Sequence, residues 1–299
     1  MMSHTPSGMM NLRTLLPALL LAAAVALPAH GAILVEDPVD IGTGAGEYSN
    51  NTKLDGQPST PTTGGWDGAW NSGNAPKSQS GGLEYTGIPG VTIGGSGGTE
   101  GHIDTGDGAA DRGIATDSTL GSASELWMRI LWQPNSTLGP EFFNIRRDSG
   151  GSADGRIVIR RSPTIGDASN RNDLMVDPIG GGAQVPDEFA TLSGGDTHLL
   201  LFRLTIDRAS GVDDTVDLWA DPTATSVSGL GTPTASVTAN LLDGANDQLS
   251  QLDFTGQSVY QLDEFAIGES FADVTVIPEP ATLALLGLGG LVMTHRRRR

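Results

Sequence analysis

The alternation of apolar and polar side chains limits most strongly what this chain can fold into. In residues 125–132, ELWMRILW, Leu126, Met128, Ile130 and Trp132 occupy every second position. Successive side chains of an extended strand point to opposite faces, so a period of two places these four on one side of a sheet. No stretch of residues 32–276 shows the 3.6-residue period of an amphipathic helix over about eleven residues. The pattern therefore predicts β-strands.

The same alternation recurs on both sides of a turn. Segments 198–208 (HLLLFRLTIDR) and 214–222 (DTVDLWADP) predict the two strands of a hairpin. The side chains predicted to face the core are Leu200, Phe202, Leu204, Ile206, Val216 and Leu218. Further strands are predicted at 142–147, 155–161 and 258–268, and short strands with long loops at 33–121. Closely spaced strands without helices between them predict an antiparallel β-sandwich or jelly roll.

Composition and charge narrow the function classes. The chain has 299 residues and no Cys, which excludes disulfides and thiolate metal sites. Its formal net charge is −18, and residues 32–277 alone hold 12 basic and 34 acidic residues, a formal charge of −22. Such a body is repelled by nucleic acid and by anionic lipid. The acidity suits either cation binding or the solubility of an exported protein.

Residues 1–31 have the three parts of a secretory signal peptide. Arg13 supplies the positive charge, residues 15–27 are apolar, and small residues follow. With Ala29 and Gly31 at positions −3 and −1, cleavage after Gly31 is predicted, and the body then spans residues 32–276. The candidates for the true first residue are Met1, Met9 and Met10.

The C-terminal residues 277–299 combine three features. Pro278, Glu279 and Pro280 precede residues 281–294, which carry no charge. The chain then ends in Arg296, Arg297, Arg298 and Arg299. Fourteen helical residues reach about 21 Å, so spanning a ~30 Å hydrocarbon core needs local thinning or snorkelling of the arginines. The arginines predict a C-terminus left in the cytoplasm, and the prolines predict an accessible peptide before a short transmembrane helix at 281–294.

This arrangement resembles the PEP-CTERM sorting signal of Gram-negative bacteria. In that family an exosortase, an integral-membrane enzyme, recognises the signal and processes the exported protein near the triplet. The resemblance implies export, an exosortase as partner, and membrane attachment through the C-terminal segment before processing. It also implies an association with the cell envelope or with exopolysaccharide. A plain C-terminal anchor has the same topology but leaves the Pro-Glu-Pro triplet unexplained.

A second resemblance covers the body. The hairpin 198–222, QLDEFAIG near its end and GGWDGAW…GGLEYTG at 64–87 resemble laminin-G-like, concanavalin A-like jelly rolls of exported bacterial proteins. Some folds of this kind are glycoside hydrolases with E-x-D-x-(x)-E on one strand, and no such string occurs here. Asp263 and Glu264 are adjacent, so they are expected on opposite faces of a strand. The acidic residues Glu125 and Glu269 stand outside any such string.

Other catalytic signatures are also missing from the sequence. There is no H-E-x-x-H and no Walker A motif. Only His102 and His198 remain after both predicted processing events, and His198 is expected at the rim of a strand. We therefore predict no catalytic activity.

Two acidic turns are candidates for a calcium site. The candidate ligands are Asp104, Asp107 and Asp111 in the first turn and Asp207, Asp213 and Asp214 in the second. Oxygen-rich loops suit Ca²⁺, and laminin-G-like folds often hold one calcium ion. Neither stretch has the EF-hand spacing, and Asp and Gly favour turns in any case. Both interpretations, a calcium site and ordinary turn chemistry, are open.

Exposed aromatic rings are the usual platform for sugars in such folds. Trp127 and Trp219 fall on the faces opposite the predicted core residues of their strands, so they are candidates for ligand binding. The alternative is that a second sheet or a loop covers them. Trp66 and Trp70 lie in a predicted loop, which packs against the body in the proteins that it resembles.

The sequence thus leaves three functions. The first is an exported, non-catalytic β-sandwich sorted to the cell envelope or to the extracellular polysaccharide matrix. The second is a lectin-like carbohydrate-binding module, and the third is a polysaccharide hydrolase or lyase. The third lacks a catalytic carboxylate motif.

Overall fold

The computed structural model describes most of the predicted body. It covers residues 33–42, 47–57, 65–73, 76–95, 100–106, 108–134, 141–147, 154–163, 170–179, 185–189, 192–209, 211–242, 247–256 and 260–275. All of them belong to one unit of the chain, Gly31–Arg299. The predicted signal peptide at 1–31, the predicted sorting signal at 277–299 and Asp107 lie outside the described residues. Within the described part, no helix has the length and apolar character needed to cross a bilayer.

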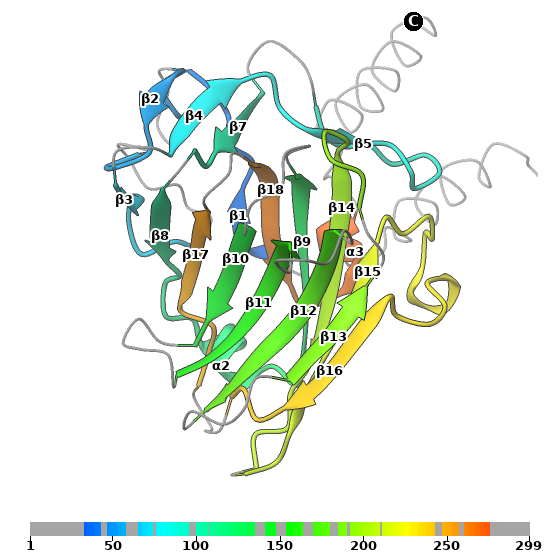
Figure 1. The fold of residues 1–299 in the computed structure, drawn as a ribbon. Helices are drawn as coiled ribbons and strands as arrows, with labels where there is room; N and C mark the ends of the chain where they lie inside the picture. Colours follow the sequence, from blue (N-terminus) through cyan, green and yellow to red (C-terminus); the bar gives the residue numbers. More distant parts are fainter. Residues whose placement is uncertain are drawn as a thin grey trace, which may run out of the picture. The chain divides into compact units, whose positions relative to one another are not determined.

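The larger of two antiparallel sheets contains nine strands (Figure 1). They are β1 (Ile33–Asp37), β2 (Thr52–Lys53), β4 (Lys77–Ser80), β7 (Gly101–Asp104), β9 (Glu125–Gln133), β14 (His198–Thr205), β15 (Asp214–Ala220), β16 (Ala235–Ala239) and β18 (Gln261–Gly268). Their order is β16-β15-β14-β9-β18-β7-β4-β2, and β1 pairs with β18. The predicted hairpin is confirmed, because β14 and β15 pair antiparallel with Leu200 opposite Ala220.

The second sheet contains seven strands and lies in front of the first in Figure 1. They are β3 (Asn71–Ser72), β8 (Ala109–Gly113), β10 (Glu141–Arg146), β11 (Asp154–Pro163), β12 (Asn170–Ile179), β13 (Val185–Phe189) and β17 (Gln251–Gly256). Their order is β13-β12-β11-β10-β17-β8-β3. Strands β10 and β11 confirm two predicted strands, whereas β12, β13, β16 and β17 were not predicted.

The remaining described elements are short. They are the two-stranded sheet of β5 (Glu84–Tyr85) and β6 (Ile93–Gly94), the helices α2 (Ser118–Ser122) and α3 (Phe271–Thr275), and the 3-10 turn η1 (Val227–Gly229). Asp117 caps α2, because its Oδ1 accepts hydrogen bonds from the backbone N–H groups of Thr119 and Leu120. The prediction of an all-β antiparallel sandwich is therefore confirmed.

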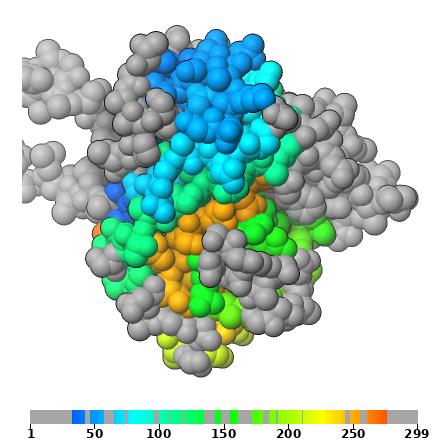
Figure 2. All heavy atoms as spheres, turned by 90° about the vertical axis from the view of Figure 1, so that its left-hand side faces the viewer, coloured from blue at the N-terminus to red at the C-terminus, as the bar shows by residue number. Residues whose placement is uncertain are grey.

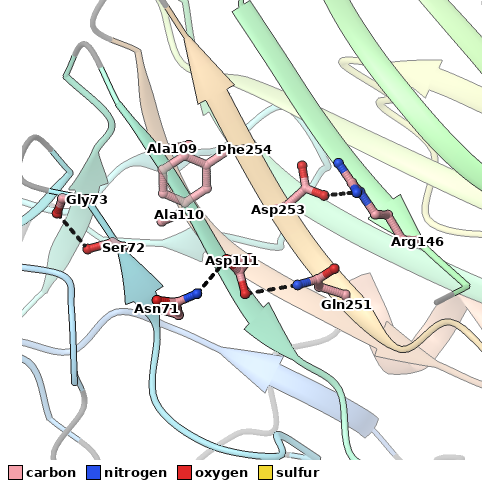
Figure 3. Close-up of a pocket in the computed structure, with 10 residues that line it drawn as sticks. All are labelled: Asn71, Ser72, Gly73, Ala109, Ala110, Asp111, Arg146, Gln251, Asp253 and Phe254. Atoms are coloured by element: carbon pink, nitrogen blue, oxygen red, sulfur yellow. Dashed lines mark hydrogen bonds and ion pairs between the residues drawn. The ribbon is translucent and has the colours of Figure 1, made fainter. Parts of the chain in front are cut away.

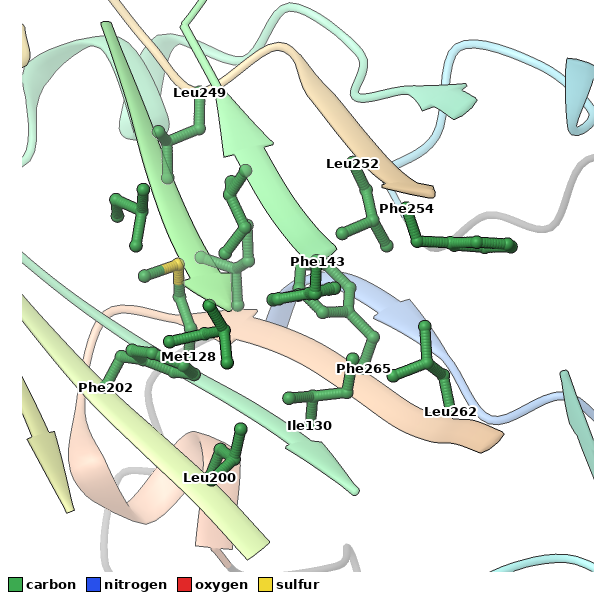
Figure 4. Close-up of a cluster of buried hydrophobic side chains, with 14 of the residues drawn as sticks. Met128, Ile130, Phe143, Leu200, Phe202, Leu249, Leu252, Phe254, Leu262 and Phe265 are labelled. Carbon is green, nitrogen blue, oxygen red and sulfur yellow. The ribbon is translucent and has the colours of Figure 1, made fainter. Parts of the chain in front are cut away.

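The main core lies between the two sheets (Figure 4). Met128 and Ile130 of β9 and Phe202 of β14 belong to it, together with Phe143 of β10 and Leu252 of β17. All the side chains predicted to face the core in segments 125–132, 198–208 and 214–222 are buried members of this cluster. A period of two in the sequence therefore identified the inward face of the central strands.

The outer face of the nine-stranded sheet is also covered. Leu131 and Leu199 pack with side chains of the β5–β6 sheet. Trp127, Trp219 and Ala266 pack with Phe271 and Val274 of α3. Strand β9 is consequently buried on both faces. Strands of antiparallel sheets commonly have one face in contact with solvent, so the full burial of β9 is unusual.

A buried polar network ties the N-terminal segment to the sandwich. The guanidinium of Arg112 on β8 pairs with Asp37 of β1 at 2.5 Å, and Tyr48 donates to the same carboxylate at 2.6 Å. The indole of Trp70 donates to Tyr48, while Arg112 lies over the ring of Trp66, 4.4 Å from its centroid. These contacts bury Trp66 and Trp70 of the segment that the sequence placed in a loop against the body.

Candidate functional site

A polar groove crosses the outer face of the seven-stranded sheet. It has a volume of about 510 Å³ and is open to solvent along β3, β8, β17 and β10. Its lining residues are Asn71, Ser72, Gly73, Ala109, Ala110, Asp111, Arg146, Gln251, Asp253 and Phe254. Figure 2 shows this face, with the surface of β17 between those of β8 and the neighbouring strands β10 and β11. We call this set of ten residues the polar groove.

Strand register explains why the polar groups of the groove meet. Asn71 lies opposite Asp111, Asp111 opposite Asp253, and Asp253 opposite Asn144. Directly opposed residues share one face of a sheet, so four strands contribute one continuous polar row. The inward neighbours of this row, such as Phe143 and Leu252, belong to the core.

The two carboxylates of the groove are held by amide and guanidinium groups (Figure 3). Asp111 accepts hydrogen bonds from the side-chain amides of Asn71 at 3.1 Å and Gln251 at 2.9 Å, one on each oxygen. Asp253 accepts from the amide of Asn144 at 2.5 Å and forms an ion pair with Arg146. Burial raises the pKa of Asp253, while Arg146 and Asn144 act in the opposite direction.

Ion pairs continue across the sheet beyond the groove. Arg156 of β11 pairs with Asp177 of β12, and Arg160 pairs with Asp173 at 2.9 Å. The two aspartates are buried, whereas the arginine side chains remain about a quarter to a third exposed, at 24% and 32%. On this face of β10, β11 and β12, every arginine side chain that the structure describes therefore pairs with a carboxylate on a neighbouring strand.

The predicted calcium ligands do not gather in the described structure. Asp104 lies on β7 of one sheet and Asp111 on β8 of the other, and Asp104 accepts from Gln79 at 2.8 Å. In the second turn Asp214 is buried and accepts three backbone N–H groups, from Asp207, Leu241 and Leu242. Among the described residues no group of three acidic or His side chains is arranged to hold a metal. Asp107 lies outside them, and calcium binding at either turn stays a prediction.

The two tryptophans predicted as ligand-binding residues are buried. Trp127 is 1% exposed and Trp219 is 5% exposed, and their rings stack with centroids 5.8 Å apart. Phe271 packs edge-on against Trp127 at 5.5 Å, and Arg203 lies over both indoles. The structure thus realises the alternative in which these rings are covered, here by α3, and they offer no face to a sugar.

The acidic residues considered for catalysis also have structural surroundings. The expectation that Asp263 and Glu264 face opposite sides is wrong, because a bulge in β18 with Glu264 at φ +54° turns both away from the core. Asp263 accepts from the N–H of Leu83 at 2.9 Å, and Glu264 pairs with Arg129 at 2.8 Å. Both carboxylates are buried. The exposed Glu125 accepts from the Trp127 indole.

The two histidines are likewise held in place. His102 is buried, and its Nδ1 lies 2.6 Å from the carbonyl of Gly81. His198 was expected at a rim but is only 7% exposed, with its ring nitrogens facing Asp221 at 2.7 Å and the carbonyl of Ser193 at 3.0 Å. Neither contact involves a serine hydroxyl, so the described part of the chain shows no Ser-His-Asp arrangement at either histidine.

Sequence reasoning missed the polar groove. Its signal is the period of two in FFNIR and QLDF, where polar residues alternate with core residues. The sequence does not show that β17 lies between β10 and β8, which is what assembles the groove from segments more than a hundred residues apart.

The described body is an antiparallel β-sandwich with a polar groove on the outer face of its seven-stranded sheet. The C-terminal residues 276–299 match the family model of the PEP-CTERM protein-sorting motif. The chain therefore carries a PEP-CTERM sorting signal, which implies exosortase processing and indicates an exported protein sorted to the cell surface.

Several solved structures are similar to this chain. An endo-β-1,4-glucuronan lyase from the fungus Trichoderma reesei has 14% identity and a TM-score of 0.44, covering 76% of this chain and 98% of that one. A protein of unknown function from Shewanella oneidensis has 15% identity and a TM-score of 0.42, covering 92% and 100%. The carbohydrate recognition domain of Emp46p has 6% identity and a TM-score of 0.39, covering 59% and 83%. Similarity at this level carries no argument for an activity, and no curated protein matches the sequence.

Proposed function

We propose that this protein is an exported, non-catalytic β-sandwich that resides in the cell envelope or the extracellular polysaccharide matrix of a Gram-negative bacterium. The PEP-CTERM motif at 276–299 carries the proposal, because it follows directly on a folded body whose last described element, α3, ends at Thr275. The formal charge of −22 on residues 32–277 supports a soluble body at the surface that does not adhere to anionic lipid.

The absence of catalysis is part of the proposal. A general acid must carry a proton at the working pH and reach the substrate. In the groove, both oxygens of Asp111 and both of Asp253 already contact protein groups, so neither carboxyl is free to meet a substrate, although burial raises the pKa of Asp253. The buried Asp263–Glu264 pair has raised pKa values through burial, but both side chains are enclosed.

The sorting proposal is tested by fractionation of cells that express an exosortase. One variant replaces Pro278, Glu279 and Pro280 by alanine and keeps the apolar segment and the arginines. We expect the wild type in the envelope or matrix fraction with a processed C-terminus, and the variant unprocessed in the membrane. If both chains fractionate alike and neither is processed, the tail is a plain anchor and the proposal fails.

A second candidate function, glycan binding, is favoured by the polar groove. Its lining combines amide, guanidinium, hydroxyl and carboxylate groups in one open depression, which is the mixture that hydrogen-bonds sugar hydroxyls. Binding of oligosaccharides by the full chain tests this function. Turnover of the same oligosaccharides, abolished in Asp111→Asn and Asp253→Asn, would instead establish a hydrolase or lyase.

A further inference from the structure

The charges of the polar groove restrict which glycans it can accept. Resting on the proposed glycan binding, we infer that the groove takes a neutral, hydroxyl-rich glycan segment and rejects glycans that carry carboxylate or sulfate groups.

The cation that lines the groove is already paired. Arg146 forms its ion pair with Asp253 inside the groove, with side-chain exposures of 24% and 11%. The neighbouring Arg156 and Arg160 pair with Asp177 and Asp173. An acidic sugar would have to displace a carboxylate from one of these arginines, and the displaced aspartate would then be left buried without a counter-charge. Recognition of an anion by these arginines is therefore disfavoured.

The net charge of the groove acts in the same direction. Arg146 contributes one positive charge, and Asp111 and Asp253 contribute two negative charges, so the lining has a formal charge of −1. The surrounding body is strongly acidic, at −22 for residues 32–277. A uronate chain would approach against this field, and its approach would be assisted by salt rather than weakened by it.

The remaining hydrogen-bonding groups suit hydroxyls. Asn71 and Gln251 each donate one side-chain N–H to Asp111. Each of these amides also has a second N–H, which can donate, and a carbonyl oxygen, which can accept. The carboxylates of Asp111 and Asp253 have further lone pairs that accept from O–H groups. A sugar hydroxyl donates one hydrogen bond and accepts others, so it matches alternating donors and acceptors. Phe254 lines the groove, but its side chain is 0% exposed and offers no stacking face.

Small residues make the room that the ligand would fill. Gly73 and Ala109 line the groove and are exposed, and nothing lies within 4 Å of a Cβ built on Gly73. Ala109 lies two residues before Asp111 on β8 and therefore on the same outer face, so Ala109→Trp should fill the groove from its solvent side. The matched control is a tryptophan at Val227, which is 45% exposed on η1 outside the groove.

The test measures binding of the full chain to two oligosaccharide probes of equal length by calorimetry. One probe is a neutral β-glucan oligomer and the other is a uronate oligomer. We expect the wild type and Val227→Trp to bind the neutral oligomer with affinity independent of salt, and Ala109→Trp to bind it about tenfold more weakly or not at all. We expect no binding of the uronate oligomer at low salt.

The outcomes separate this inference from the proposal on which it rests. Preferential binding of the uronate oligomer, with an affinity that falls as salt rises, would overturn the inference and leave glycan binding in place. Equal binding of the neutral oligomer by Ala109→Trp and the wild type would move the site away from the groove. Binding of neither probe would overturn glycan binding itself, while sorting through the PEP-CTERM signal is decided by fractionation alone.

Discussion

Replacing Glu264 by glutamine should change how the stability of the body depends on pH. Glu264 is 6% exposed in the β18 bulge, and its carboxylate pairs with Arg129 at 2.8 Å. Burial raises its pKa from the ordinary value of 4.5 to about 7, against the attraction of Arg129 and with the repulsion of Glu36, Glu100 and Asp40. The folded state therefore keeps a proton between about pH 4.5 and pH 7 that the unfolded chain has released.

The sign of the effect follows from this proton. Where the folded state binds more protons than the unfolded state, the free energy of unfolding falls as the pH rises. The loss should begin near pH 4.5 and level off above about pH 7. At about 1.4 kcal/mol per pKa unit the difference amounts to about 3 kcal/mol, or roughly 6–12 °C in melting temperature for a domain of this size. The protein should thus be more stable in mild acid than at neutral pH.

The assay is urea denaturation of the full chain and of Glu264→Gln at a series of pH values from 4.5 to 8. Glutamine keeps the shape and an acceptor for Arg129 but does not titrate, so its curve should be flatter by about 3 kcal/mol across this range. Loss of the carboxylate also weakens the pairing of buried Arg129, which shifts the whole curve without changing its slope. The exposed Glu269→Gln should keep the wild-type slope. Parallel curves for the wild type and Glu264→Gln would refute the reasoning.

Four other predictions concern the packing of α3, access to the sorting motif that follows it, one histidine and the calcium candidates. Phe271→Ala removes a buried ring from the tryptophan cluster under α3 and should lower the free energy of unfolding by about 3–5 kcal/mol. The control Val227→Ala, at an exposed position, should change that free energy by no more than about 0.5 kcal/mol. A loss below about 1 kcal/mol for Phe271→Ala would contradict the packing. Thr275 is buried and the sorting motif begins at the next residue, so the packed end of α3 should limit access of the exosortase to the motif. A Gly-Ser linker inserted after Thr275 should therefore speed processing, and equal rates with and without the linker would show that α3 does not limit access. Both ring nitrogens of His198 face acceptors; burial lowers its pKa, but the hydrogen bonds to Asp221 and a backbone carbonyl outweigh this and raise it above 6.5. The stability due to this pair should be complete below pH 6.5 and be lost as the pH rises through the folded pKa, and Asp221→Asn should abolish that dependence in NMR titration and melting. Melting with Ca²⁺ and with Mg²⁺ at equal ionic strength tests the calcium prediction: a calcium site should give a larger rise in melting temperature with Ca²⁺, and equal shifts would indicate ordinary turn chemistry.

Several features of this protein follow from the sequence alone. The inward faces of β9, β14 and β15 follow from a period of two, because a strand that separates core from surroundings must alternate. The hairpin of β14 and β15 follows because its turn residues lie between two such strands. The sorting signal at 276–299 follows because its recognition depends on the local order of a triplet, an apolar run and terminal arginines.

Strands without that pattern escaped prediction. In β12 the outward Asp173 and Asp177 interrupt the apolar run, and β16 is short, so neither shows strong alternation over a long window. Their charges are tolerated because arginines on β11 pair with them, and that pairing depends on a register that links residues far apart in the chain. Local composition does not contain this information.

Tertiary structure alone decided which outward groups are available for function. Trp127 and Trp219 have an outward position in their strands, but α3 packs on them, because the exposed face of a hydrophobic sheet is stabilised by any apolar segment that can cover it. Asp263 and Glu264 share one side because a single extra residue in β18 shifts the alternation. The polar groove exists because β17 inserts between β8 and β10 and aligns Asp111 with Asp253. A strand's periodicity says which side chains leave the core, whereas the neighbours of that strand, which come from distant parts of the chain, decide what those side chains meet.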